Sequence, residues 1–159
     1  MKKLNFKRGS TLRLSKGFTL IELLVVVAII GILASVVLAS LSTARNKGND
    51  AKIQGQLSSM RSAAEIYYST NNSYGTSTLT GVGCSTPAGM WTDTASGLNA
   101  LALGTNYPGG TAPSCNSNGT AWAAWHALSS DSTKYFCVDS SGAAKTESSA
   151  PGSTVVACP

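Results

Sequence analysis

A single carboxylate, Glu22, stands at the start of the longest apolar stretch in the chain, and residues 23–44 carry no charged side chain. A carboxylate among apolar groups is costly unless an opposite charge pairs with it. The sequence offers such a partner, because cleavage after Gly17 would create an α-amino group on Phe18, about one helical turn before Glu22. This spacing predicts an ion pair between an amine and an acid in apolar surroundings.

Two helical segments must position this pair. Residues 18–44 are apolar on every side and would form a helix of about 40 Å, long enough to span a bilayer. In residues 45–70 apolar side chains recur every three or four positions, which is typical of an amphipathic helix with one buried stripe. That stripe consists of Ile53, Leu57, Met60, Ala64 and Tyr67. Asn71-Asn72-Ser73 and Gly75 predict that the helix ends near Ser69.

Gly31, Ser35 and Ala39 recur every four residues within the apolar segment and form a ridge of small side chains. Such ridges let membrane helices approach one another closely, so we expect helix packing here. An equally good interpretation is that small residues are simply common in membrane helices.

The positive charge of the chain is concentrated at its start. The 159 residues carry a formal net charge of +5, yet six of the 12 basic side chains precede Phe18, without any acid among them. A chain starting at Phe18 would keep six basic against seven acidic side chains. Basic residues before an apolar span favour retention on the cytoplasmic side, which predicts an N-in, C-out orientation. A nucleic-acid role for this basic run is the weaker interpretation, because the run adjoins the apolar span and would be removed.

Residues 16–24 read Lys-Gly-Phe-Thr-Leu-Ile-Glu-Leu-Leu, and this order resembles the class III signal of type IV pilins and pseudopilins. The resemblance extends from Lys16 to about Gly75. It implies that a membrane peptidase cleaves after Gly17 and methylates Phe18. It also implies that Glu22 engages the Phe18 amine of a neighbouring subunit in a filament built on an assembly platform.

Residues 71–159 differ in composition, being rich in small and polar residues. Alternating and aromatic patterns predict an antiparallel meander of three or four strands that rests on the amphipathic stripe. The expected strands are 121–128, 134–139 and 143–147, with a weaker edge strand at 153–158. Residues 84–115 read as a long loop with a short helix at 98–103. The expected fold class is therefore α+β and pilin-like: a long N-terminal helix packed on a small antiparallel β-sheet head.

Four cysteines lie in this head: Cys84, Cys115, Cys137 and Cys158. An even number of cysteines in an exported chain predicts disulfides, and the spacings lack the close pairs of a metal site. Three pairings are possible, of which we favour Cys84–Cys115 with Cys137–Cys158. Because the head contains few large apolar groups, two such bonds would support a thin core.

No catalytic site, metal site or cofactor is predicted. His126 is the sole histidine and reads as a packed or hydrogen-bonded structural residue. The acids of the head are scattered, and only Lys134 and Lys145 oppose them, which is a poor surface for nucleic acid. The three tryptophans read as core residues rather than as an exposed stacking surface, namely Trp91, Trp122 and Trp125.

These patterns divide the chain into a cleaved leader (1–17), an apolar helix (18–44), an amphipathic continuation (45–70) and a disulfide-bonded β head (71–159). The function predicted first is the structural subunit of a surface filament, made as a single-pass membrane protein and assembled from identical or homologous subunits. The first alternative is a pseudopilin or minor pilin of a type II secretion or DNA-uptake machine. The second is a secreted binding domain, because residues 37–39 also fit an ordinary signal-peptidase site. Adhesion, motility, DNA capture and secretion are all compatible with the sequence.

Overall fold

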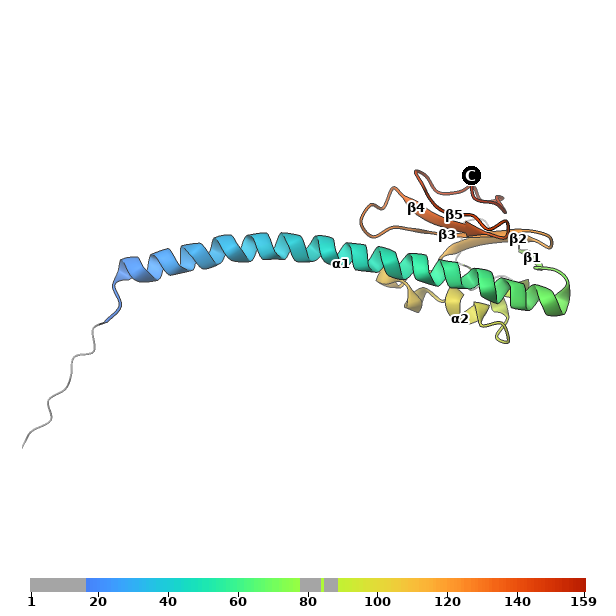
Figure 1. The fold of residues 1–159 in the computed structure, drawn as a ribbon, viewed down its shortest axis with the longest axis horizontal. Coiled ribbons are helices and arrows are strands. Elements are labelled where there is room, and N and C mark those ends of the chain that lie inside the picture. The colour runs from blue at the N-terminus through green and yellow to red at the C-terminus, as the bar shows by residue number, and fades with distance from the viewer. Residues whose placement is uncertain (1–16, 78–83, 85–88) are drawn as a thin grey trace, which may run out of the picture. The chain divides into compact units, whose positions relative to one another are not determined.

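The computed structural model describes residues 17–77, 84 and 89–159, so the predicted leader, apart from Gly17, lies outside the described residues. Contacts divide the chain into two units, one ending at Ala39 and the other beginning at Ser40. Helix α1 (Leu20–Asn71) begins in the first unit and ends in the second (Figure 1). The predicted long N-terminal helix is thereby confirmed.

Every described residue of the first unit is exposed to solvent in the single chain. The apolar part of α1 reaches a mean hydropathy of 3.0 over an 18-residue window, and none of that window is buried. By length and composition α1 could cross a membrane. Exposed apolar surface on this scale requires another environment, either lipid or further protein.

In the second unit α1 buries one face, as the spacing predicted. Ile53, Leu57, Met60 and Ala64 are completely buried. The helix ends at Asn71, two residues beyond the predicted position. Asn72 then adopts a left-handed conformation with φ 50°, which asparagine tolerates better than most residues because its side chain can hydrogen-bond locally.

The head contains a five-stranded antiparallel sheet with the strands in sequence order (Figure 1). The strands are β1 (Thr76–Ser77), β2 (Ser114–Asn118), β3 (Trp122–Ala127), β4 (Tyr135–Asp139) and β5 (Ala144–Glu147). Register places Ala124 between Cys115 on β2 and Val138 on β4. The α+β class and the three strands predicted at 121–128, 134–139 and 143–147 are confirmed as β3, β4 and β5.

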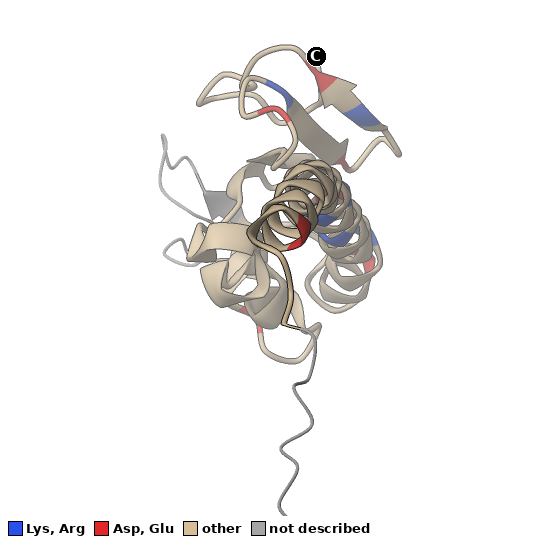
Figure 2. Cartoon of the chain, turned by 90° about the vertical axis from the view of Figure 1, so that its left-hand side faces the viewer, with Lys and Arg blue, Asp and Glu red and all other residues tan. Residues whose placement is uncertain are grey.

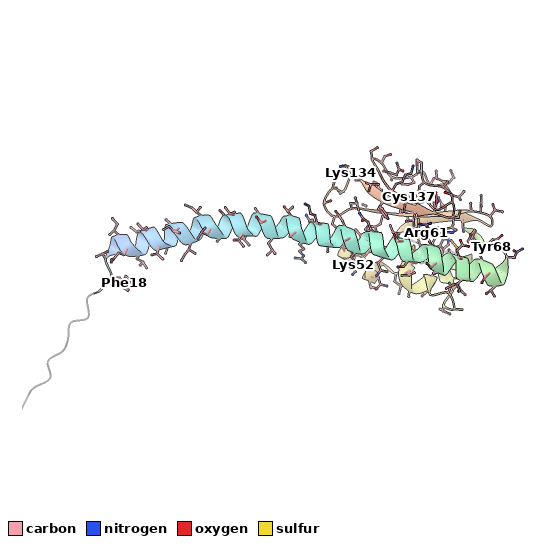
Figure 3. All side chains as sticks on the ribbon, viewed as in Figure 1. Phe18, Lys52, Arg61, Tyr68, Lys134 and Cys137 are labelled. Carbon is pink, nitrogen blue, oxygen red and sulfur yellow. A yellow bond between two sulfur atoms is a disulfide. The ribbon has the colours of Figure 1, made fainter. Side chains whose placement is uncertain are left out.

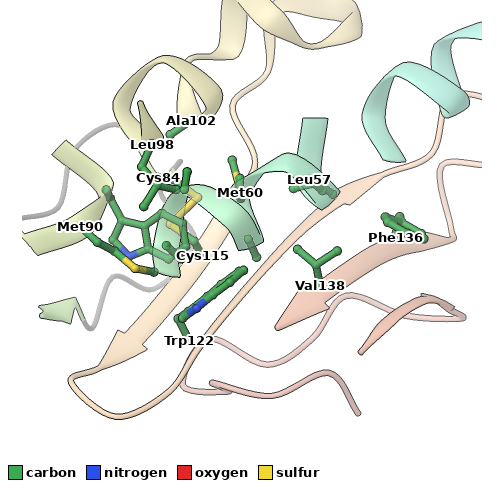
Figure 4. Packing of buried hydrophobic residues seen from close by; sticks show 14 of the residues in the cluster. Leu57, Met60, Cys84, Met90, Leu98, Ala102, Cys115, Trp122, Phe136 and Val138 are labelled. Atoms are coloured by element: carbon green, nitrogen blue, oxygen red, sulfur yellow. A yellow bond between two sulfur atoms is a disulfide. The ribbon is translucent and has the colours of Figure 1, made fainter. Parts of the chain in front are cut away.

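Side chains alternate between the two faces of the sheet, so that each face has its own apolar cluster. Trp122, Ala124, Phe136 and Val138 join the stripe of α1 in the main core (Figure 4). The intervening side chains form the second cluster on the opposite face, with Cys158 packed against them; they are Ala123, Trp125 and Cys137. Strand β4 is buried on both faces for this reason.

A segment of short helices closes the main core between β1 and β2. Trp91, in the 3-10 helix η1 (Gly89–Thr92), packs edge-on against Trp122 with 5.9 Å between ring centroids. The short helix α2 (Leu98–Ala102) was predicted and is confirmed. Two further 3-10 turns complete the segment, η2 (Gly104–Asn106) and η3 (Pro108–Gly110). All three tryptophans are buried, as predicted.

The predicted edge strand at residues 153–158 is wrong, because that tail contains no strand. Two of its main-chain groups bond to side chains instead: the Val155 carbonyl accepts from Asn116 Nδ2 at 3.0 Å, and the Cys158 N–H donates to Asp139 at 2.8 Å. Beside β3 the sheet has two further strands, β1 and β2, which were not predicted. There β2 pairs with β3, and β1 pairs with β2.

Candidate processing and assembly site

The start of α1 is a capping box formed by Thr19 and Glu22. The Thr19 N–H and hydroxyl both donate to Glu22 Oε2, at 2.8 and 2.7 Å, and the Glu22 N–H donates to Thr19 Oγ1 at 3.2 Å. Each side chain thereby satisfies a main-chain donor that the first helical turn leaves without an intrahelical partner. The sequence Thr-Leu-Ile-Glu thus begins the helix by its own local chemistry.

This capping arrangement holds the Glu22 carboxylate at the very beginning of the helix. Phe18 lies one residue before Thr19 and is 90% exposed (Figure 3). Phe18, Ile21, Glu22 and Val25 border one shallow hollow of about 370 Å³. Residues 18 and 22 therefore border the same hollow at the helix start.

Gly17 is not explained by the fold of the chain. A methyl group built at Gly17 would meet no atom of the described residues within 4 Å. No contact among the described residues therefore requires glycine at this position.

Gly31, Ser35 and Ala39 lie on the exposed apolar part of α1. The Ser35 hydroxyl donates to the Ile32 carbonyl at 2.8 Å, so it is satisfied within its own helix. A methyl group built at Gly31 would meet nothing within 4 Å. The ridge is open to outside partners, and helix packing along it stays a prediction.

The four cysteines form two bonds in the structure, Cys84–Cys115 and Cys137–Cys158, which is the pairing favoured from the sequence. They close loops on opposite sides of the sheet, with Cys115 and Cys84 in the main core and Cys137 and Cys158 at the outer face. The histidine is packed as well: His126 stacks on Tyr107 with 4.9 Å between ring centroids, and its ring nitrogens lie at hydrogen-bonding distance from the carbonyls of Ala127 and Thr111.

Within the described residues, no group of three histidine, cysteine, aspartate or glutamate side chains could hold a metal ion. The functional residue that the sequence analysis missed is Thr19. Its signal was available, because a threonine three residues before a glutamate at the start of an apolar run is the sequence pattern of a capping box.

The comparison with known proteins bears directly on this helix start. Residues 12–38 match the family model described as the prokaryotic N-terminal methylation motif. The chain is 38% identical over 104 residues to the type IV wide pilus major component PilA4 of Thermus thermophilus, covering 63% of this chain and 79% of that relative. The chain belongs to the type IV pilin and pseudopilin family.

Two further relatives match this pilin-family chain over shorter stretches. The type II secretion system core protein G of Pectobacterium carotovorum is 39% identical over 59 residues, which is 37% of this chain and 38% of the relative. The type IV major alpha-pilin of Moraxella bovis is 42% identical over 50 residues, which is 31% of each. No solved structure matches the chain.

Proposed function

We propose that this chain is the structural subunit of a type IV pilus-like surface filament. The observation that carries the proposal is the apolar part of α1, which lies largely within the methylation motif and has no cover in the single chain. Lipid can cover it before assembly, and the apolar helices of other copies can cover it afterwards. The relationship to the wide pilus major component of Thermus thermophilus supports a filament over a soluble role.

In this proposal residues 1–17 are a leader, removed by a prepilin peptidase that also methylates Phe18. Gly17 is in keeping with a cleavage requirement set by that enzyme, since no contact among the described residues requires glycine there. The basic residues of the leader would hold this end in the cytoplasm, with the head outside.

Assembly would then bring the Phe18 amine of one subunit to the Glu22 carboxylate of a neighbour. Removing one partner of a buried ion pair costs about 3–5 kcal/mol, whereas the net gain from the pair is small, so the pair sets register more than stability. Thr19 supports this role, because its two hydrogen bonds fix the carboxylate before a neighbour arrives. Gly31, Ser35 and Ala39 would allow close helix packing in the filament core.

A pseudopilin of a type II secretion system is the second candidate. The match to core protein G favours it specifically. The longer match to a pilus major component, which reaches into the head, favours the filament subunit. The two candidates share cleavage and methylation, and they differ in whether the protein accumulates outside the cell as long filaments.

The deciding experiment is mass spectrometry of protein sheared from the cell surface. A dominant species that begins at methylated Phe18 would support the filament subunit. The same species confined to membranes and absent from the sheared fraction would favour the pseudopilin. A chain that begins at Ser40 would refute both, since cleavage there discards the assembly helix.

A further inference from the structure

The head contains a polar cavity of about 450 Å³ between α1 and the turn that joins β4 to β5. Its size is within the usual range of small-molecule sites. One wall is a single face of α1, formed by Ser58, Arg61, Ser62 and Glu65. Residues 139–142 form the opposite wall, and Trp122 contributes to the lining. All of these residues belong to the second unit, Ser40–Pro159, so the cavity exists in a single subunit.

Arg61 is the cation of this cavity. Charged residues are sparse along the described ribbon (Figure 2), and Arg61 has no ion-pair or hydrogen-bond partner among the described residues. The β4–β5 turn leaves room for the Arg61 side chain because Gly142, where φ is 102°, has no side chain. A methyl group at Gly142 would lie only 3.2 Å from Arg61 Nη2. The five N–H donors of the Arg61 guanidinium are therefore available to a ligand in the cavity.

The two carboxylates of the cavity differ in how far they are already satisfied. Asp139 is buried and accepts four hydrogen bonds, two from Ser141 and one each from the N–H groups of Ala143 and Cys158. Glu65 accepts one, from the Tyr74 hydroxyl at 2.8 Å. Burial and this hydrogen bond raise the pKa of Tyr74 to about 12, so the hydroxyl stays a donor. Glu65 Oε2 has no partner among the described residues, and it supplies the free acceptor.

Hydroxyl groups complete the lining. Ser58 and Ser62 have no hydrogen-bond partner among the residues described. Ser140 Oγ accepts a hydrogen bond from the main-chain N–H of Trp122 at 3.2 Å, and the hydroxyl proton of Ser140 remains available as a donor. The cavity thus combines unused donors, an unused acceptor and hydroxyls that can do either.

This balance of charge selects the ligand class. A cation would meet the Arg61 guanidinium, and an anion would meet the carboxylates of Glu65 and Asp139. Apolar ligands would leave these polar groups without partners. Sugar hydroxyls donate and accept at once, and therefore match a cavity that offers both functions. We propose that the cavity between α1 and the β4–β5 turn is a binding site for an uncharged saccharide.

The test is a saturation-transfer and titration NMR experiment on the full chain in phosphocholine micelles, which contain no sugar headgroup. The probes are cellobiose and lactose, compared with glucuronate and glucosamine. We expect the neutral sugars to bind and to shift the Gly142 amide. The charged sugars should bind roughly fivefold more weakly, the factor for one unfavourable charge contact near water. Tighter binding of glucuronate or of glucosamine than of the neutral sugars would overturn the ligand class.

Variants locate the site. Arg61→Gln should weaken neutral-sugar binding roughly tenfold, because it removes charge-assisted hydrogen bonds. Lys52→Gln removes the same charge from the same helix outside the cavity (Figure 3) and should leave affinity unchanged. Equal affinity of Arg61→Gln and the unaltered chain, or absence of binding by either neutral sugar, would overturn the proposal.

A second variant keeps the test decisive if Arg61→Gln perturbs the fold. Glu65→Gln retains an oxygen that can accept a hydrogen bond from Tyr74 but removes the carboxylate charge. The difference in affinity between the neutral sugars and glucuronate should therefore become smaller. Unchanged discrimination would show that Glu65 does not face the ligand and would refute the assignment. The NMR assay uses unassembled subunits, so absence of sugar binding would not contradict the filament proposal. Equally, absence of N-terminal processing would not contradict the proposed saccharide site.

Discussion

Replacing Glu22 by glutamine separates the two tasks that the proposed function gives to this side chain. Glutamine can still take the capping-box position, so the helix start should lose no more than about 1 kcal/mol. The charge, however, is lost, and the amine of a neighbouring Phe18 would be buried without its partner. Breaking a buried pair in this way costs about 3–5 kcal/mol, which corresponds to a roughly 100-fold or larger loss in the equilibrium for subunit addition.

The assay compares membrane-bound and sheared protein by immunoblotting, with mass spectrometry of the N-terminus and electron microscopy of the filaments. Glu22→Gln and Glu22→Val should both insert and be cleaved and methylated, yet give almost no filaments. Thr19→Ala is the matched control, because it removes both side-chain bonds of the cap while keeping the charge; it should cost about 1 kcal/mol and reduce assembly only about fivefold. Normal filament yield from Glu22→Gln would refute the pairing role.

Three further predictions concern the head. Leu57→Ala should lower the free energy of unfolding by about 2–5 kcal/mol in chemical denaturation, because Leu57 is fully buried, whereas Ile66→Ala on the exposed side of α1 should change it by less than about 0.5 kcal/mol. Selective loss of the Cys137–Cys158 bond, which closes a 21-residue separation, should cost about 3 kcal/mol and increase hydrogen exchange in the tail before α1 is affected. Burial raises the pKa of Asp139, but hydrogen bonds from three neighbouring residues outweigh it and hold the pKa below its usual value. The resulting stabilisation is fully present above the unfolded pKa of about 3.9 and disappears as the pH falls through the lower folded value; Asp139→Asn should be less stable at neutral pH and lose this acid-dependent component of unfolding.

The parts of the fold that follow from periodicity were predictable. A stripe with a spacing of three and four residues identified the buried face of α1, since only one side of a surface helix meets the core. The run of apolar residues in β4 predicted a buried strand, and the structure shows that it is buried on both faces. The β2–β3 hairpin was predictable too, because Asn118-Gly119 is a strong hairpin signal and Gly119 has a φ of 89°; it was missed because β2 is made of small polar residues.

Other features depend on contacts that no local pattern contains. Asp50 lies in an amphipathic stretch and reads as a surface residue, yet it is buried because it accepts hydrogen bonds from the N–H groups of Ser129 and Ser130 far along the chain. The tail at residues 153–158 has valines that favour a strand, but its bonds to Asn116 and Asp139 hold it against the outer face. Local propensity is a weak predictor where tertiary contacts decide.

The difference between the two parts of α1 explains why the sequence of a single chain could predict a helix that packs against other molecules. From residue 45 onward most apolar positions lie on one face, and the head alone is sufficient to bury that face; Ile66 on the exposed side is an exception. Before that point apolar residues occupy every face, and a single head has no means of surrounding a helix on all sides. Ile21, Val25 and Leu41, each more than 50% exposed, therefore require burial in lipid or in other copies. Lipid is available only until the subunit leaves the membrane. In the proposed filament, therefore, protein would cover the same surface, and the proposed pairing would give the charge of Glu22 at its end an amine partner.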